Sequence, residues 1–229
     1  MKIEIWSDVM CPFCYIGKKH FEQALEQISY KENIEVEWKS FQLNPDLSKT
    51  EITSVNDYLI QAKGISEEQV IAMNNQLAEM GKTVGIDFQQ QHSKVINTGD
   101  AHRLIHFAQA KGQGSEAEER LFKAYFTEGK NIADTETLAE LGEEIGLNKT
   151  EILGMLNSDE NVFEVASDIL DARNIGVSGV PFFVIDRKYA ISGAQPVEYF
   201  VSALTQAYEK DHLKDAENGA SCDVEGNCD

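Results

Sequence analysis

Two cysteines three residues apart, Cys11 and Cys14, are the side chains of this sequence best suited to chemistry. Thiol–disulfide exchange requires one thiolate that attacks a disulfide and a second thiol that resolves the mixed disulfide. An apolar stripe runs from Cys14 through Phe21 and Leu25, which predicts that a helix begins at this motif. We expect an exposed Cys11, stabilised as the thiolate at the helix N-terminus, to attack first, and a shielded Cys14 to act second.

Pro12 and Phe13 separate the two cysteines. Proline suits the first turn of a helix, because the N–H that it lacks is not needed there. Residues between two exchanging cysteines tune the reduction potential. Pro12 and Phe13 do not by themselves distinguish an oxidant from a reductant or an isomerase.

A second element that could serve this chemistry is Val180-Pro181, at the head of an apolar run that continues to residue 185. Proline cannot donate to a sheet, so it marks the start or the edge of a strand. A cis bond before Pro181 would turn the backbone at Val180 toward the sulfurs, where a substrate chain could pair with it. A trans proline that only starts the strand is the alternative.

Cys222 and Cys228 lie in an acidic segment at the C-terminal end of the sequence. The loop between them is short enough for a disulfide, and we hypothesise a second redox pair that exchanges with Cys11 and Cys14. Two alternatives remain. The tail cysteines have no part in catalysis, or all four cysteines form a zinc-binding interaction module, although this spacing is looser than in a zinc ribbon.

The elements that must position Cys11 follow from hydrophobic periodicity. Residues 2–6 and 34–38 alternate as strands on either side of the first helix, which favours a parallel crossover. Residues 55–157 show helical patterns without a convincing strand, with helix N-caps predicted at Ser66 and Asn148. A helix from Val162, strands at 180–185 and 189–192, and a helix from Pro196 to Tyr208 complete the pattern.

The net charge bears on which macromolecules could be partners, and the histidine spacing bears on whether a metal is bound. The 39 acidic residues against 20 lysines and arginines give a net charge of -19, so we expect neither nucleic acid nor a membrane surface as a partner. No signal-peptide-like segment precedes the first strand, and we expect a cytoplasmic protein. His102 and His106, with Asp100 nearby, are spaced to share a helix face, but a structural role is favoured and no metal is expected.

The segment from Ser7 to Lys18 resembles the active-site segment of the DsbA family, especially its FrnE-like branch. Segments 97–104, 179–183 and 191–196 resemble that branch in order and spacing, so the resemblance spans residues 2–208. It implies an α/β thioredoxin fold interrupted by a helical domain. It also implies that Cys11 is the nucleophile, Cys14 the resolving thiol and Pro181 a cis proline.

Pattern and resemblance together predict three regions. Residues 1–43 and 159–211 are expected to form a discontinuous thioredoxin-like domain. A large all-helical domain, residues 44–158, is expected between its βαβ and ββα halves. Residues 212–229 are predicted to be a flexible acidic tail.

The FrnE-like branch is similar to kappa-type glutathione transferases and 2-hydroxychromene-2-carboxylate isomerases, which use glutathione. Those enzymes typically have serine at the position of Cys11 and lack the second cysteine. The presence of both Cys11 and Cys14 therefore favours exchange with protein or peptide disulfides. A glutathione-dependent small-molecule isomerase or transferase is the alternative. No bound cofactor is expected, and glutathione is a candidate reductant.

Overall fold

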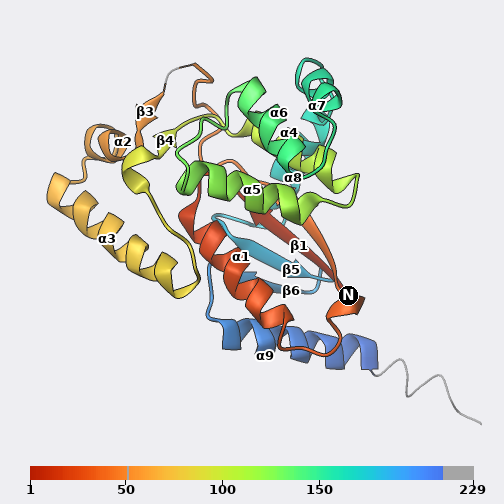
Figure 1. Ribbon diagram of the computed structural model, residues 1–229. Helices are drawn as coiled ribbons and strands as arrows, with labels where there is room; N and C mark the ends of the chain where they lie inside the picture. The colour runs from red at the N-terminus through yellow and green to blue at the C-terminus, as the bar shows by residue number, and fades with distance from the viewer. Residues whose placement is uncertain (51, 214–229) are drawn as a thin grey trace, which may run out of the picture.

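A four-stranded sheet forms the centre of the computed structural model, which describes residues 1–50 and 52–213 (Figure 1). Its strands are, in sheet order, β2 (Glu35–Ser40), β1 (Lys2–Ser7), β5 (Phe182–Ile185) and β6 (Tyr189–Ser192). β1 is parallel to β2, and β5 is antiparallel to β1 and to β6. The predicted parallel crossover and the predicted thioredoxin fold are confirmed.

The two faces of the sheet bury different side chains because residues alternate along a strand. Ile5 faces α1 (Pro12–Leu25) and α9 (Val197–Tyr208), where the Phe183 ring lies 5.5 Å from Phe21 and 4.7 Å from Phe200 between ring centroids. Trp6 points to the opposite face and packs near α8 (Val162–Asn174). The sheet is thus covered on both faces, and α1 is held firmly on one of them.

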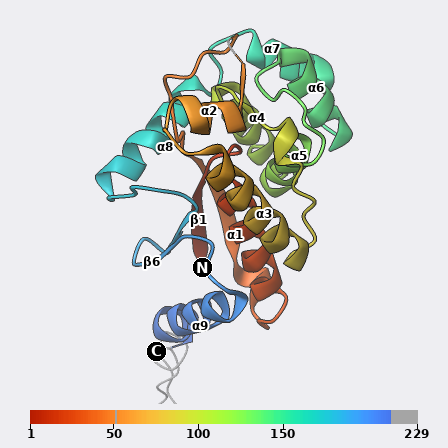
Figure 2. The same ribbon diagram turned by 90° about the vertical axis from the view of Figure 1, so that its left-hand side faces the viewer.

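The segment between β2 and α8 supplies the remaining helices of the described chain, which lie around one end of the sheet (Figure 2). The helices are α2 (Val55–Gln61), α3 (Glu67–Thr83), α4 (Gly99–Gln109), α5 (Gly114–Phe126), α6 (Thr135–Glu144) and α7 (Lys149–Leu156). Short helical turns occupy Lys31–Asn33, Gln90–His92 and Glu209–Leu213.

Both predicted helix caps are confirmed. Ser66 forms a complete capping box with Gln69, and the Asn148 side chain accepts a hydrogen bond from the Glu151 amide. α3 lies alongside α1 in both views (Figures 1 and 2). Within the described residues, each helix is too short or too polar to cross a membrane.

The expectation that the inserted segment contains no strand is wrong. β3 (Thr53–Ser54) pairs antiparallel with β4 (Lys94–Val95), and the Val55 amide donates to the Ser93 carbonyl beside this ribbon. Two-residue strands are too short to show a period of two, and their partners lie about forty residues apart in the sequence. The inserted segment is therefore mostly, and not entirely, helical.

Candidate active site

The turn that presents Cys11 is built around Asp8, which has no exposed surface. Its carboxylate accepts hydrogen bonds from the amides of Leu43, at 2.8 Å, and Met10, at 3.3 Å. The Asp8 carbonyl accepts from the Cys11 amide at 2.8 Å. Asp8 thus fixes the path of the chain between the end of β1 and the start of α1.

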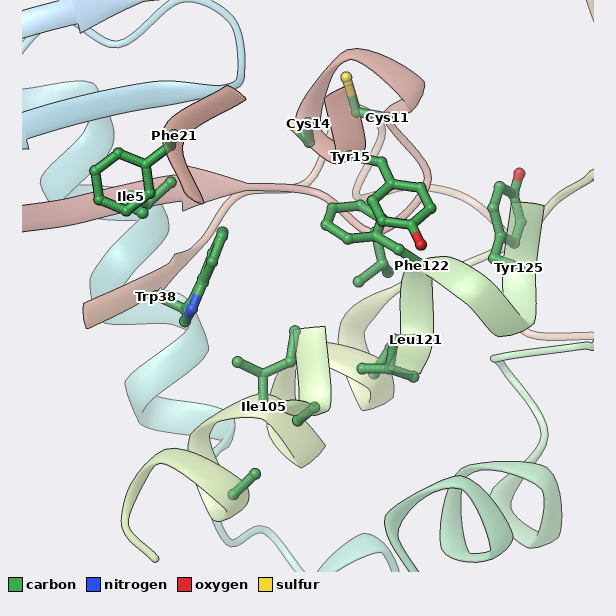
Figure 3. Packing of buried hydrophobic residues seen from close by; sticks show 14 of the residues in the cluster. Ile5, Cys11, Cys14, Tyr15, Phe21, Trp38, Ile105, Leu121, Phe122 and Tyr125 are labelled. Atoms are coloured by element: carbon green, nitrogen blue, oxygen red, sulfur yellow. The ribbon is translucent and has the colours of Figure 1, made fainter. Parts of the chain in front are cut away.

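Cys11 is the N-cap residue of α1, and Pro12 occupies its first turn as predicted. The prediction that Cys11 is exposed is wrong, because the residue is only 5% exposed, against 1% for Cys14. The reason is the loop before β5, where the Val180 carbonyl lies 3.6 Å from the Cys11 sulfur. Figure 3 shows this sulfur at the end of α1, pointing away from the packed rings of Tyr15 and Phe122.

The two thiols are both free and differ in acidity. The pKa of Cys11 lies below its usual value, first because the Cys14 thiol donates to the Cys11 thiolate; burial opposes this, and the amides of Cys14 and Phe13 reinforce it. Burial raises the pKa of Cys14 well above its usual value, and the neighbouring Cys11 raises it further. Thiolate stabilisation, more than exposure, distinguishes the two thiols.

Pro181 lies opposite the cysteines, and the Val180–Pro181 peptide bond is cis. The Pro181 carbonyl accepts from the Gly193 amide at 2.8 Å, which continues the pairing of β5 with β6. Gly17 permits the close approach of α1, because a Cβ atom there would lie 2.8 Å from the Pro181 ring. His20 of α1 also bonds the Gln195 carbonyl at 2.8 Å, which holds α1 against the loop after β6.

Beneath the cysteines lies a buried acid that the sequence analysis missed, Glu118 of α5. The Ser7 hydroxyl donates to the Glu118 carboxylate at 2.5 Å, and both residues are at most 2% exposed. Burial raises the pKa of Glu118 to about 7. A signal was present, since Glu118 is four residues before Phe122 and beside Ala117 on the buried stripe of α5.

Lys18 is a second buried charge close to the site, only 2% exposed. Its amine pairs with Glu22 and, at 2.7 Å, with Glu119. Burial opposes the charged form, but these two carboxylates outweigh it and raise the pKa of Lys18. α1 and α5 are therefore joined by ion pairs as well as by the ring stack of Tyr15 on Phe122, 4.8 Å between centroids.

An apolar groove of about 330 Å³ opens beside the start of α1, between α1, α2, α3 and α5. Phe13 and Met73 are half-exposed along it. Leu77, a buried residue of α3, also lines the groove. The further apolar side chains of the groove include Met10, Leu59, Met80 and Phe126.

The histidines singled out from the sequence do not share one site. His102 lies 3.6 Å from Asp8, whereas His106 lies 2.9 Å from Asp168. Asp100 pairs instead with Arg103 at 2.9 Å. Across residues 1–50 and 52–213, no three potential metal ligands come together.

Cys222 and Cys228, predicted as a second redox pair, lie outside the described residues.

The comparisons with known proteins agree with this geometry. Residues 2–205 match the model of the DsbA-like thioredoxin domain. The uncharacterized protein YwbO of Bacillus subtilis is 28% identical over 91% of this chain and 98% of its own length. A structure described as a probable DsbA oxidoreductase of Streptomyces coelicolor is 36% identical, with a TM-score of 0.88 over 92% of this chain and 91% of that one.

More distant structures share the fold. The cytosolic disulfide reductase DsbM of Pseudomonas aeruginosa has a TM-score of 0.65 at 18% identity, covering 90% of this chain and 98% of its own. A 2-hydroxychromene-2-carboxylate isomerase has a TM-score of 0.68 at 14% identity, covering 96% and 100%. Because the family model matches residues 2–205, this chain belongs to the DsbA-like thioredoxin family, whose members include thiol oxidoreductases.

Proposed function

We propose that this chain exchanges disulfides with protein or peptide substrates through Cys11 and Cys14. The observation that carries the proposal is the opposite acidity of the two thiols at the start of α1. The thiol whose pKa is lowered faces the Val180 carbonyl, and the thiol whose pKa is raised lies behind it.

The proposed reaction has two steps. The Cys11 thiolate attacks a substrate disulfide, forms a mixed disulfide and releases one substrate thiolate. Cys14 then attacks the Cys11 sulfur, so that a Cys11–Cys14 disulfide forms and the second substrate thiolate leaves. The substrate gains two electrons and the protein loses two. The reverse sequence oxidises a substrate dithiol, and the reduction potential decides the direction.

Two features support a polypeptide substrate. The backbone at Val180 lies beside Cys11, where an extended chain can pair with it. The apolar groove is lined by Met10 and Pro12, which flank Cys11 in the sequence, and is suited to an apolar side chain next to the substrate cysteine. A small glutathione-dependent reaction would not need the second cysteine.

We propose glutathione as the thiol that reduces the Cys11–Cys14 disulfide and the cytoplasm as the compartment. DsbM, which shares this fold, is described as cytosolic and has a structure with GSH. The acidic surface disfavours nucleic acid and anionic membranes as partners.

A trapping experiment tests the proposal in a Cys222→Ser/Cys228→Ser background, where Cys11 and Cys14 are the remaining thiols. The added Cys14→Ser change should accumulate mixed disulfides between Cys11 and a cysteine-containing peptide, visible by mass spectrometry of non-reduced protein. The added Cys11→Ser change should abolish exchange, a loss of at least ~100-fold, because the buried Cys14 is a poor nucleophile. Full exchange by the Cys11→Ser protein would refute the assignment.

A further inference from the structure

We propose that Glu118 accepts the proton of Cys14, through the Ser7 hydroxyl, as Cys14 resolves the mixed disulfide. When the Cys11–Cys14 disulfide is later reduced, Glu118 returns this proton to Cys14 by the same path. The inference deepens the proposed function, because it concerns the second step of that exchange.

The need for a proton acceptor follows from the burial of Cys14, which is 1% exposed. A thiol attacks only as the thiolate, and burial raises the pKa of Cys14 well above its usual value. At neutral pH almost all of Cys14 is therefore protonated. A nearby base that takes the proton during the attack removes this barrier.

Ser7 connects the thiol to the acid. Its hydroxyl donates to the Glu118 carboxylate at 2.5 Å. The same hydroxyl favours the thiolate of Cys14 and lowers the pKa of that thiol, against the larger effect of burial. A hydroxyl can accept one proton while it donates another. The Cys14 proton can thus pass to Ser7 as the Ser7 proton passes to Glu118, after which the hydroxyl donates to the new thiolate.

The groups around Glu118 leave it able to accept a proton near neutrality. Lys18 of α1 and His102 of α4 favour its charged form, whereas Asp8 of the loop after β1 disfavours it. Lys18 is already paired with Glu22 and Glu119, and His102 lies beside Asp8. Burial outweighs the attraction, and the pKa of Glu118 is about 7.

The proposed resolution and reduction steps conserve protons and electrons. In resolution, the S–H bond of Cys14 breaks and an O–H bond forms on Glu118. The Cys14 sulfur bonds to the Cys11 sulfur, and the substrate leaves as a thiolate that takes a proton from water. Glu118, 1% exposed, keeps its proton while the protein is a disulfide. Attack by an external thiolate on Cys11 then releases Cys14 as a thiolate, which recovers the proton from Glu118.

The kinetic test follows the two steps separately by stopped flow, with a disulfide-linked fluorescent peptide and reduced protein. The variants are Glu118→Gln, which cannot accept the proton, and Ser7→Ala, which interrupts the path but keeps the acid. Glu116→Gln, an exposed acid on the same helix, is the matched control. At pH 7, Glu118→Gln and Ser7→Ala should form the mixed disulfide at the wild-type rate and resolve it about 100-fold more slowly.

The pH profile distinguishes proton transfer from a structural effect. Wild-type resolution should level off above about pH 7, where Glu118 is ionised. In Glu118→Gln it should keep rising, about tenfold per pH unit, because only hydroxide then generates the Cys14 thiolate. Equal slowing of both steps, or wild-type profiles in both variants, would overturn the inference. If Glu118→Gln does not fold, Ser7→Ala alone decides between these outcomes.

A spectroscopic test needs no substrate. Infrared difference spectra between the dithiol and disulfide forms, prepared with dithiothreitol and diamide at pH 7, where Glu118 of the dithiol form is partly ionised, should show a protonated carboxyl band that grows on oxidation. Glu118→Gln should lack this band and Glu116→Gln should keep it. A wild-type spectrum without a redox-linked carboxyl band would refute the relay. Wild-type protein that shows the band yet forms no mixed disulfide would refute the proposed function and leave the relay standing.

Discussion

Two buried acids, Glu118 and Asp168, lie at the ends of neighbouring strands, and their surroundings give them opposite properties. Ser7 and Ser40 are paired in register at the ends of β1 and β2. Ser7 donates its hydroxyl to Glu118, whereas Ser40 donates its amide to Asp168 at 2.9 Å. Glu118 is 1% exposed and Asp168 is 4% exposed, so burial by itself does not separate them.

The difference lies in the donors around each carboxylate. Asp168 also contacts Lys39 at 3.0 Å and His106 at 2.9 Å. Burial would raise the pKa of Asp168, but the bonds from His106, Ser40 and Lys39 outweigh it and lower the pKa. Glu118 receives the Ser7 hydroxyl and only more distant positive charge, so its pKa rises. A buried acid with several donors is held as a fixed charge, and one with a single hydroxyl can carry a proton.

The largest effect expected from this comparison is on folding stability, in Asp168→Asn. The change leaves Lys39 and His106 without their shared carboxylate, and loss of one partner from a buried ion pair costs about 3 kcal/mol. A lowered pKa contributes stability above the unfolded value near 4, and this contribution is lost as the pH falls through the folded value. Urea unfolding should therefore show a larger deficit at pH 7 than at pH 3. An equal deficit at both pH values would mean that the charge of Asp168 is not what stabilises the fold.

The second effect is smaller and opposite in sign, in Glu118→Gln. A raised carboxyl pKa means that the folded state holds the proton more tightly than the unfolded chain, so stability falls as the pH rises from about 4.5 to about 7. Glutamine carries no such cost and still accepts from Ser7. The variant should match wild type near pH 4 and exceed it by about 3 kcal/mol at pH 8. Unfolding of Glu116→Gln, measured alongside, should follow wild type. A variant less stable than wild type at pH 8 would contradict the inference that the ionised, buried Glu118 carboxylate destabilises the fold.

The same two acids show what the sequence could and could not predict. The spacing of Cys11 and Cys14, the stripe through Phe21, and the apolar run after Pro181 depend on local periodicity, and the structure agrees with each of them. The position of Glu118 on the apolar stripe of α5 indicates burial, but its role depends on Ser7, 111 residues away. Contacts of such separation leave no local pattern.

The burial of Cys11 has the same origin. Sequence reasoning placed Cys11 correctly at the helix N-cap, and from that placement predicted an exposed thiol. The loop that covers it, at Val180, is 169 residues away and is held in place by Gly17 and Gly193. The close approach of α1 to Pro181 requires a glycine at position 17, but a glycine inside a helical pattern does not reveal what it approaches.

The smallest effect expected concerns Lys18, whose charge acts on Glu118 through space. Lys18→Met keeps much of the buried side-chain volume and removes a positive charge that lowers the pKa of Glu118. Coulomb interaction at several ångströms in a medium of intermediate polarity is on the order of 1 kcal/mol, so the change should be modest. The carboxyl titration of Glu118, followed by infrared spectroscopy, should move to higher pH, and the plateau of the resolution rate should move with it.

Lys111→Met, which removes an exposed charge paired with Glu151, should move neither midpoint. If Lys18→Met also leaves both midpoints in place, Glu22 and Glu119 fully neutralise the Lys18 charge, and burial with His102 and Asp8 alone sets the acidity of Glu118.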